Sequence, residues 1–178
     1  MEKTRKWSII GAIFTLILGT LLHFVYEWFG GAFWSVIGAV NESTWEHLKL
    51  IFWPIVIFGI IEYIAYGKKT PGFLWTKVLS ILLGMATIVV LFYTYTGILG
   101  FHIAFVDIAT FVIGTIVAYR FAYVRLTHPQ KYDSSEWTSI LALVLIIILI
   151  VCFVCFTFQP PHIGLFLDPV TNTYGILP

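Results

Sequence analysis

Five long hydrophobic runs dominate this sequence of 178 residues and restrict the folds that it can adopt. Each run is at least as long as the stretch of about 20 apolar residues that a helix needs to cross the hydrocarbon core of a bilayer. Only 11% of the residues are charged, whereas a soluble domain carries about 25%. In lipid, backbone polar groups must be satisfied within the chain, which favours helices. The sequence therefore predicts an all-α integral membrane bundle of five transmembrane helices.

The predicted helices are joined by short loops. They cover Trp7–Phe29, Thr44–Tyr66, Trp75–Thr96, Phe101–Arg125 and Glu136–Phe158. Between the first two, residues 31–40 are apolar but too short to cross a bilayer, so we predict an interfacial or re-entrant segment there. No linker and no clear internal repeat interrupts the runs. Residues 1–178 are therefore expected to form a single transmembrane domain.

Basic residues indicate the orientation of the bundle, because Lys and Arg gather in cytoplasmic loops. Nine of the ten fall on one predicted side: Lys3, Arg5, Lys6, Lys68, Lys69, Lys77, Arg120, Arg125 and Lys131. We predict a multi-pass protein of the bacterial cytoplasmic membrane with a cytoplasmic N-terminus and an extracytoplasmic C-terminus. Residues 159–178 then form an extracytoplasmic tail that is apolar enough to lie back on the membrane surface, where it could form a lid over the outer ends of the helices.

The composition also narrows the partners. A net charge of +1 argues against nucleic acid, which requires a basic patch. Cys152 and Cys155 lie in an apolar run and imply no disulfide framework. The expected partners are membrane lipid and a small amphiphilic substrate, and the oligomeric state stays open.

Acids and histidines gather on the predicted outer side. Five of the nine acids and four of the five histidines lie there: His23, Glu27, Glu42, Glu46, His47, His102, Asp107, His162 and Asp168. The preference of Lys and Arg for cytoplasmic loops explains why lysine is scarce on this side. It does not explain the histidines or the acids inside helices. Ionisable residues within a span are costly and mark functional sites. We therefore predict one polar site at the outer ends of the helices.

The stretch VNESTWEHLKL, residues 40–50, holds part of that site. Ser43 and Glu46 fit a capping box at the start of a helix. Asn41 and Glu42 also suit a helix N-terminus, where the dipole favours negative charge. Capping leaves His47 unexplained, and Glu46 can serve either as a cap or as a general base. Asn41 and Glu42 are further site candidates.

Two other pairs extend the predicted site. His23 and Glu27 are spaced i, i+4 and share one helix face. They could present two metal ligands or simply hydrogen bond to fix helix packing. His102 and Asp107 open the fourth helix, where Asp107 needs a partner, although His102 could instead lie in the preceding loop. In the tail, His162 and Asp168 either join the site under a lid or remain solvated.

Three motifs and the polytopic layout resemble a domain-of-unknown-function family of small bacterial membrane proteins. The motifs are H-F-x-Y-E-W at His23–Trp28, N-E-S-x-W-E-H-L-K at Asn41–Lys49, and P-P…L-F-x-D-P…Y-G at Pro160–Gly175. This resemblance implies a fold more than an activity. Asn41–Leu48 also resembles locally an early motif of the adiponectin-receptor-like membrane hydrolases, which are zinc amidases of lipids. The chain has five predicted spans rather than seven and lacks a His-x-x-x-His pair, so no zinc ligand is carried over.

The leading functional hypothesis is a membrane-embedded metal-dependent enzyme, a hydrolase of a lipid or other amphiphile that is open to the outer leaflet. Histidines and carboxylates suit zinc or another divalent transition metal, which activates a bound water. The expected metal ligands are His23, Glu27, His47 and His102, with Asp107 or Glu46 as general base. The alternatives are a cation or proton transporter or channel, a non-enzymatic ligand- or haem-binding protein, and a structural bundle whose buried polar groups satisfy one another.

Overall fold

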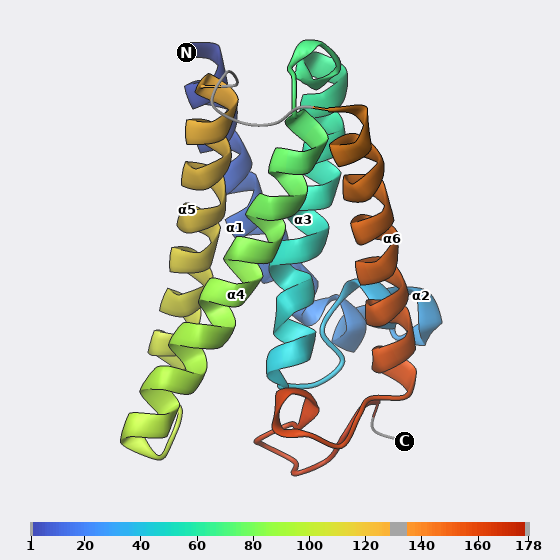
Figure 1. Ribbon diagram of the computed structural model, residues 1–178. Helices are drawn as coiled ribbons and strands as arrows, with labels where there is room; N and C mark the ends of the chain where they lie inside the picture. The colour runs from blue at the N-terminus through green and yellow to red at the C-terminus, as the bar shows by residue number, and fades with distance from the viewer. Residues whose placement is uncertain (1, 129–134, 177–178) are drawn as a thin grey trace.

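The computed structural model describes residues 2–128 and 135–176, and helices account for most of them (Figure 1). The α-helices are α1 Glu2–Phe29, α2 Gly31–Ile37, α3 Thr44–Ala65, α4 Phe73–Leu99, α5 Ala104–Thr127 and α6 Glu136–Phe158. Short 3₁₀ turns cover Gly67–Lys69 and Gly164–Phe166. Within these ranges the only extended pairing is an isolated bridge between Leu167 and Tyr174. The predicted all-α fold is confirmed.

Five of these helices are long and apolar enough to cross a membrane, and they match the five predicted runs. Their outward faces carry exposed aliphatic and aromatic side chains such as Ile17, Ile64, Phe105 and Ile147. In water such faces would aggregate, whereas lipid solvates them. The protein is therefore a multi-pass membrane protein. Lys131, one of the nine basic residues on the predicted cytoplasmic side, lies outside the described residues.

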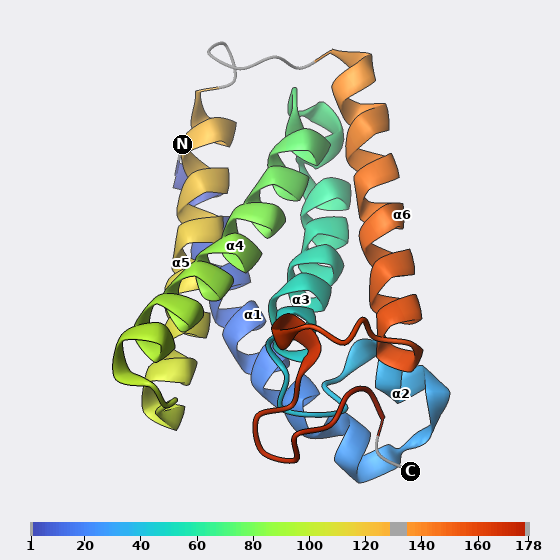
Figure 2. The same ribbon diagram turned by 60° about the horizontal axis from the view of Figure 1, so that its bottom comes forward.

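The short segment between the first two spans is the seven-residue helix α2. It lies across the end of the bundle where α3 begins and where the C-terminal tail folds back (Figure 2). We call this the α2 end. One helix boundary that matters for the site differs from the prediction: α5 begins at Ala104 and not at Phe101. His102 therefore lies in the loop before α5 and not in the helix itself.

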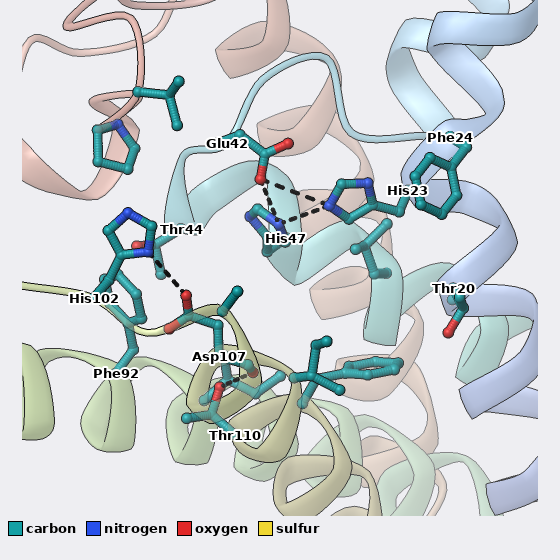
Figure 3. A pocket seen from close by; sticks show the side chains of 18 residues that line it. Thr20, His23, Phe24, Glu42, Thr44, His47, Phe92, His102, Asp107 and Thr110 are labelled. Atoms are coloured by element: carbon teal, nitrogen blue, oxygen red, sulfur yellow. Dashed lines mark hydrogen bonds and ion pairs between the residues drawn. The ribbon is translucent and has the colours of Figure 1, made fainter.

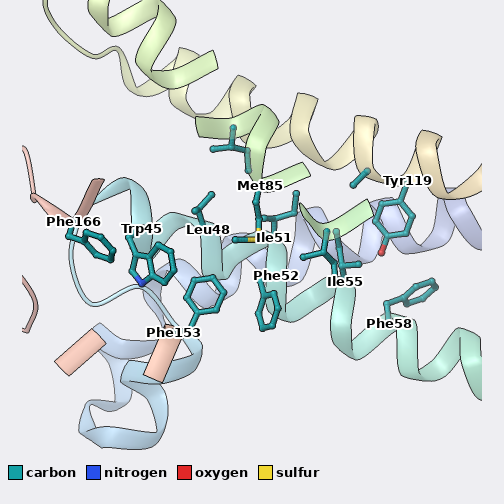
Figure 4. Packing of buried hydrophobic residues seen from close by; sticks show 13 residues of the cluster. Trp45, Leu48, Ile51, Phe52, Ile55, Phe58, Met85, Tyr119, Phe153 and Phe166 are labelled. Carbon is teal, nitrogen blue, oxygen red and sulfur yellow. The ribbon is translucent and has the colours of Figure 1, made fainter. Parts of the chain in front are cut away.

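Helix α3 forms the centre of the hydrophobic core (Figure 4). Ile51, Phe52 and Ile55 are almost completely buried, and α3 contacts both α1 and α4. Helix α6 joins this core through Phe153, whose ring centroid lies 4.8 Å from that of Trp45 and 4.9 Å from that of Phe52. The bundle thus holds the start of α3 in a fixed place at the α2 end.

Helices α4 and α5 approach each other closely at two glycines. A Cβ atom at Gly114 would lie 2.9 Å from the carbonyl oxygen of Gly84, and one at Gly84 would lie 3.1 Å from that of Gly114. Small residues allow this approach in membrane bundles, where close packing drives association. We expect Gly114→Ala to lower the free energy of unfolding by about 1–3 kcal/mol, because the added Cβ overpacks the contact and forces the helices apart.

A matched control is available at Gly59, where an added Cβ meets nothing within 4 Å. Gly59→Ala should leave the stability unchanged or raise it, because alanine favours helix. Reversible unfolding in mixed detergent micelles measures both variants. Equal stabilities for the two variants would contradict a tight contact between α4 and α5.

Candidate metal centre

A cavity of about 380 Å³ opens at the α2 end, between α1, α3, α4, α5 and the tail (Figure 3). This volume lies within the range of small-molecule binding sites, about 300–1,000 Å³. Most of its wall is apolar, including Phe24, Leu50, Ile88, Phe92 and Phe111. Its ionisable lining residues form two groups: His23, Glu42 and His47, and His102 with Asp107.

His47 is fixed by the start of α3. Ser43 caps this helix, since its side-chain oxygen accepts from the amide of Glu46 at 3.4 Å. One turn later, Nδ1 of His47 lies 2.9 Å from the carbonyl oxygen of Ser43. A carbonyl only accepts, so Nδ1 carries the proton. Such a bond fixes the ring of a metal-binding histidine and leaves Nε2 available as a ligand.

Glu42 comes from the loop between α2 and α3, which is itself tied down. The side chain of Asn41 accepts from the amide of Ser43 at 2.9 Å and donates to the carbonyl of Gly175 at 2.8 Å. The neighbouring side chains of His23 and then His47 hold the pKa of the Glu42 carboxyl well below its usual range, as positive charge on or beside the two imidazoles would. The carboxylate is therefore ionised at neutral pH, as a metal ligand must be.

The three side chains place their donor atoms in a small triangle. Nε2 of His23 lies 3.2 Å from Nε2 of His47, and Oε2 of Glu42 lies 3.4 Å from His47 Nε2 and 3.7 Å from His23 Nε2. Tetrahedral zinc with bonds of about 2.0–2.2 Å requires ligand atoms about 3.3–3.6 Å apart. The edges of the triangle lie within about 0.1 Å of that range, so the triangle is close in size to one face of a zinc tetrahedron. Two histidines and one glutamate are a catalytic zinc set that keeps the fourth position open.

The same triangle creates an electrostatic requirement. With the proton of neutral His47 on Nδ1, the lone pair of Nε2 turns toward the Glu42 carboxylate 3.4 Å away. Two acceptors at this distance repel each other unless positive charge lies between them. Either a metal ion or additional protons on the imidazoles would meet the requirement, and these two cases can be separated by experiment.

The second group lies beside the first on the cavity wall (Figure 3). Nδ1 of His102 lies 3.1 Å from Oδ2 of Asp107, and the other carboxylate oxygen accepts a hydrogen bond from the Tyr95 hydroxyl. That hydroxyl in turn accepts from the amide of Ile103 at 3.1 Å. Asp107 thus finds the partners that it was predicted to need, one of them from the end of α4. The reasoning from sequence missed Tyr95, which carries no motif.

Two predicted site residues lie elsewhere. Glu27 is exposed on α1 and is absent from both the cavity lining and the group of possible ligands, so the carboxylate beside His23 is that of Glu42. Glu46 is buried outside the cavity, where it contacts Nζ of Lys49 at 2.5 Å and accepts from the amide of Val40 at 3.1 Å. We therefore assign Glu46 to the support of the loop rather than to acid–base chemistry.

The tail packs against the cavity through backbone and side-chain contacts. Asp168 is buried, and its carboxylate accepts from the amides of Val170 at 2.8 Å and Thr171 at 3.3 Å. This turn places Pro169 and Val170 on the cavity wall. His162 is exposed and stacks on Tyr174 with the ring centroids 4.4 Å apart, outside the cavity lining. Asp168 and His162, the two predicted site residues in the tail, therefore stabilise the fold of the tail.

Searches of curated proteins and of solved structures found no match to the chain. A scan of protein families found one model that matches residues 1–176, nearly the whole length of the sequence. Its description is a family of unknown function, DUF6512. The five apolar spans, the cavity at the α2 end and the His23–Glu42–His47 group thus belong to a member of DUF6512.

Proposed function

We propose that this protein is a metal-dependent membrane hydrolase that cleaves a lipid or another amphiphile at a zinc ion held by His23, Glu42 and His47. The observation that carries the proposal is the triangle of donor atoms, with edges of 3.2, 3.4 and 3.7 Å on the wall of a cavity. Zinc or a similar divalent metal would act as a Lewis acid there and lower the pKa of a bound water to about 7.

The remainder of the cavity favours an amphiphilic substrate. Its apolar wall, with Leu50, Ile88 and Phe111, suits an acyl chain, while the polar groups suit a head group. Below the site, α3 continues into a tightly packed apolar core around Ile51 and Ile55. This favours an enzyme over a transporter, which needs a polar route across the bilayer. The distribution of basic residues between the two ends of the bundle supports a site that faces the outer leaflet of a bacterial cytoplasmic membrane.

The local resemblance of Asn41–Leu48 to the adiponectin-receptor-like hydrolases agrees with this reaction class, although the ligands are assigned here from the chain's own geometry. The test uses zinc-loaded protein in liposomes made from the total lipid extract of the source cells, with mass spectrometry of the released products. We expect wild-type protein to release fatty acids or lysolipids and Glu42→Gln to release none. Loss of a supporting hydrogen bond already costs about 10–100-fold in metal affinity, and loss of a ligand charge should cost at least as much.

Glu27→Gln is the matched control, because it makes the same change at an exposed acid outside the cavity. It should keep both zinc and turnover. Hydrolysis that is undiminished in Glu42→Gln, with zinc content unchanged, would contradict the proposed ligand set.

A further inference from the structure

A chain of three polar side chains joins the end of α4 to the start of α5 on the cavity wall. The Tyr95 hydroxyl donates to Asp107, and Asp107 accepts from Nδ1 of His102 at 3.1 Å. The amide of Ile103 fixes the Tyr95 hydroxyl from the other side at 3.1 Å. Both oxygens of the carboxylate are therefore engaged, and none of these contacts is needed to bind the metal.

This arrangement determines which nitrogen of His102 is available. A carboxylate only accepts hydrogen bonds, so Nδ1 carries the proton and Nε2 of the neutral ring has a free lone pair. Figure 3 shows the second ring nitrogen of His102 directed away from Asp107. The His102 side chain is 46% exposed, so a ligand in the cavity can reach it. An aspartate that orients a histidine in this way is the supporting half of many acid–base sites.

We propose that His102 is a catalytic acid–base residue of the cavity, with Asp107 and Tyr95 as the positioning residues that hold it. This inference rests on the proposed hydrolase function, because it assigns the proton transfer of that same reaction. It also changes the roles expected from the sequence. His102 becomes the acid–base residue in place of a metal ligand, and Asp107 positions His102 in place of acting as the general base.

The step balances without any additional reactant. Water adds to the scissile carbonyl carbon of the amphiphile, and the bond from that carbon to its leaving oxygen or nitrogen breaks. The proton lost by the attacking water passes to Nε2 of His102. His102 then returns that proton to the leaving group, so the residue is unchanged after each cycle. The products are a carboxylic acid and an alcohol or amine.

The experiment asks whether a head group bound at the metal covers His102. The probe is dodecanohydroxamic acid, a metal-chelating head group on a single acyl chain. Diethyl pyrocarbonate carbethoxylates unprotonated imidazole nitrogens, and peptide mass spectrometry measures the rate at each histidine. At about ten times its Kd the probe leaves about a tenth of the sites free, so the rate at His102 should fall about tenfold. His128 and His162 are exposed and lie outside the cavity lining, so their rates should stay constant.

Three variants sharpen the result. Asp107→Asn should lower the rate at His102 in the free protein without loss of zinc, because the amide no longer enforces the tautomer with a free Nε2. Ala104→Trp fills the cavity from an exposed lining position and should abolish protection. Phe105→Trp is its matched control, since the neighbouring side chain is 79% exposed and does not line the cavity.

The outcomes separate this inference from the proposed function. Zinc-bound protein that binds the probe but leaves His102 fully reactive would overturn the role of His102 while the hydrolase stands. Protein that binds no metal would overturn both. Protection of His102 in the wild type and in Phe105→Trp, together with its loss in Ala104→Trp, would establish that His102 faces the ligand.

Discussion

Replacing His47 by alanine is expected to reduce the metal content of the purified protein from about one zinc ion per chain to background. His47 supplies the donor atom closest to both other ligand atoms, at 3.2 Å from His23 Nε2 and 3.4 Å from Glu42 Oε2. Without it, two ligands remain, whereas catalytic zinc sites use three protein ligands. Elemental analysis of the detergent-purified protein measures the metal content, and circular dichroism checks that the helices persist.

His162→Ala is the control, because His162 is exposed and stacks on Tyr174 away from the cavity. It should retain the wild-type zinc content. Wild-type protein that contains no transition metal after loading would instead leave protons as the positive charge between Glu42 and the two imidazoles. The three side chains would then be a hydrogen-bonded group that packs α1 against the start of α3, and the hydrolase proposal would fail.

The fold could be predicted from sequence almost completely, because the length and polarity of each apolar stretch determine whether it crosses the membrane as a helix. The five spans and the short segment now seen as α2 follow from that rule. The start of α5 was misplaced by three residues because Phe101 and Ile103 are apolar and read as part of the span. Hydropathy does not distinguish a helix from an apolar loop at the same depth.

The site was predicted less completely, for a different physical reason. The structure brings four of the predicted site residues, His23, His47, His102 and Asp107, to one cavity. The sequence pairs His23 with Glu27, because spacing on a helix identifies neighbours within that helix only. The carboxylate that approaches His23 is that of Glu42, whose position depends on how the loop before α3 folds back. Contacts between elements leave no periodic signal in a single sequence.

Lys49 shows how that loop is held in place. It is fully buried, and its ammonium group contacts the Glu46 carboxylate and the Thr157 hydroxyl, each at 2.5 Å. It also donates to the carbonyl of Ser35 at 2.8 Å, at the end of α2. Glu46 accepts in turn from the amide of Val40. One buried ion pair therefore connects α2, the loop before Glu42, α3 and α6.

We expect Lys49→Met to lower the free energy of unfolding by about 3–5 kcal/mol, because it leaves the Glu46 carboxylate buried without a cation. Reversible unfolding in mixed micelles measures the loss. Zinc affinity measured by chelator competition should also weaken, because α2 and the start of the loop that carries Glu42 lose their hydrogen bonds from Lys49 at Ser35 and Gly38. The double variant Lys49→Met with Glu46→Gln should recover most of the stability, since a neutral buried pair costs far less than a single buried charge.

Lys6→Met is the control for removing a lysine, because Lys6 and its partner Glu2 are 70% and 81% exposed and 2.8 Å apart. It should leave the stability unchanged, since ion pairs in water contribute little. If Lys49→Met were as stable as Lys6→Met, Glu46 would not need a cation and the buried pair would not be what holds the loop. If instead stability fell while zinc affinity stayed constant, the anchor would support α6 alone, and the hydrogen bond from Asn41 to Gly175 would be sufficient to place Glu42.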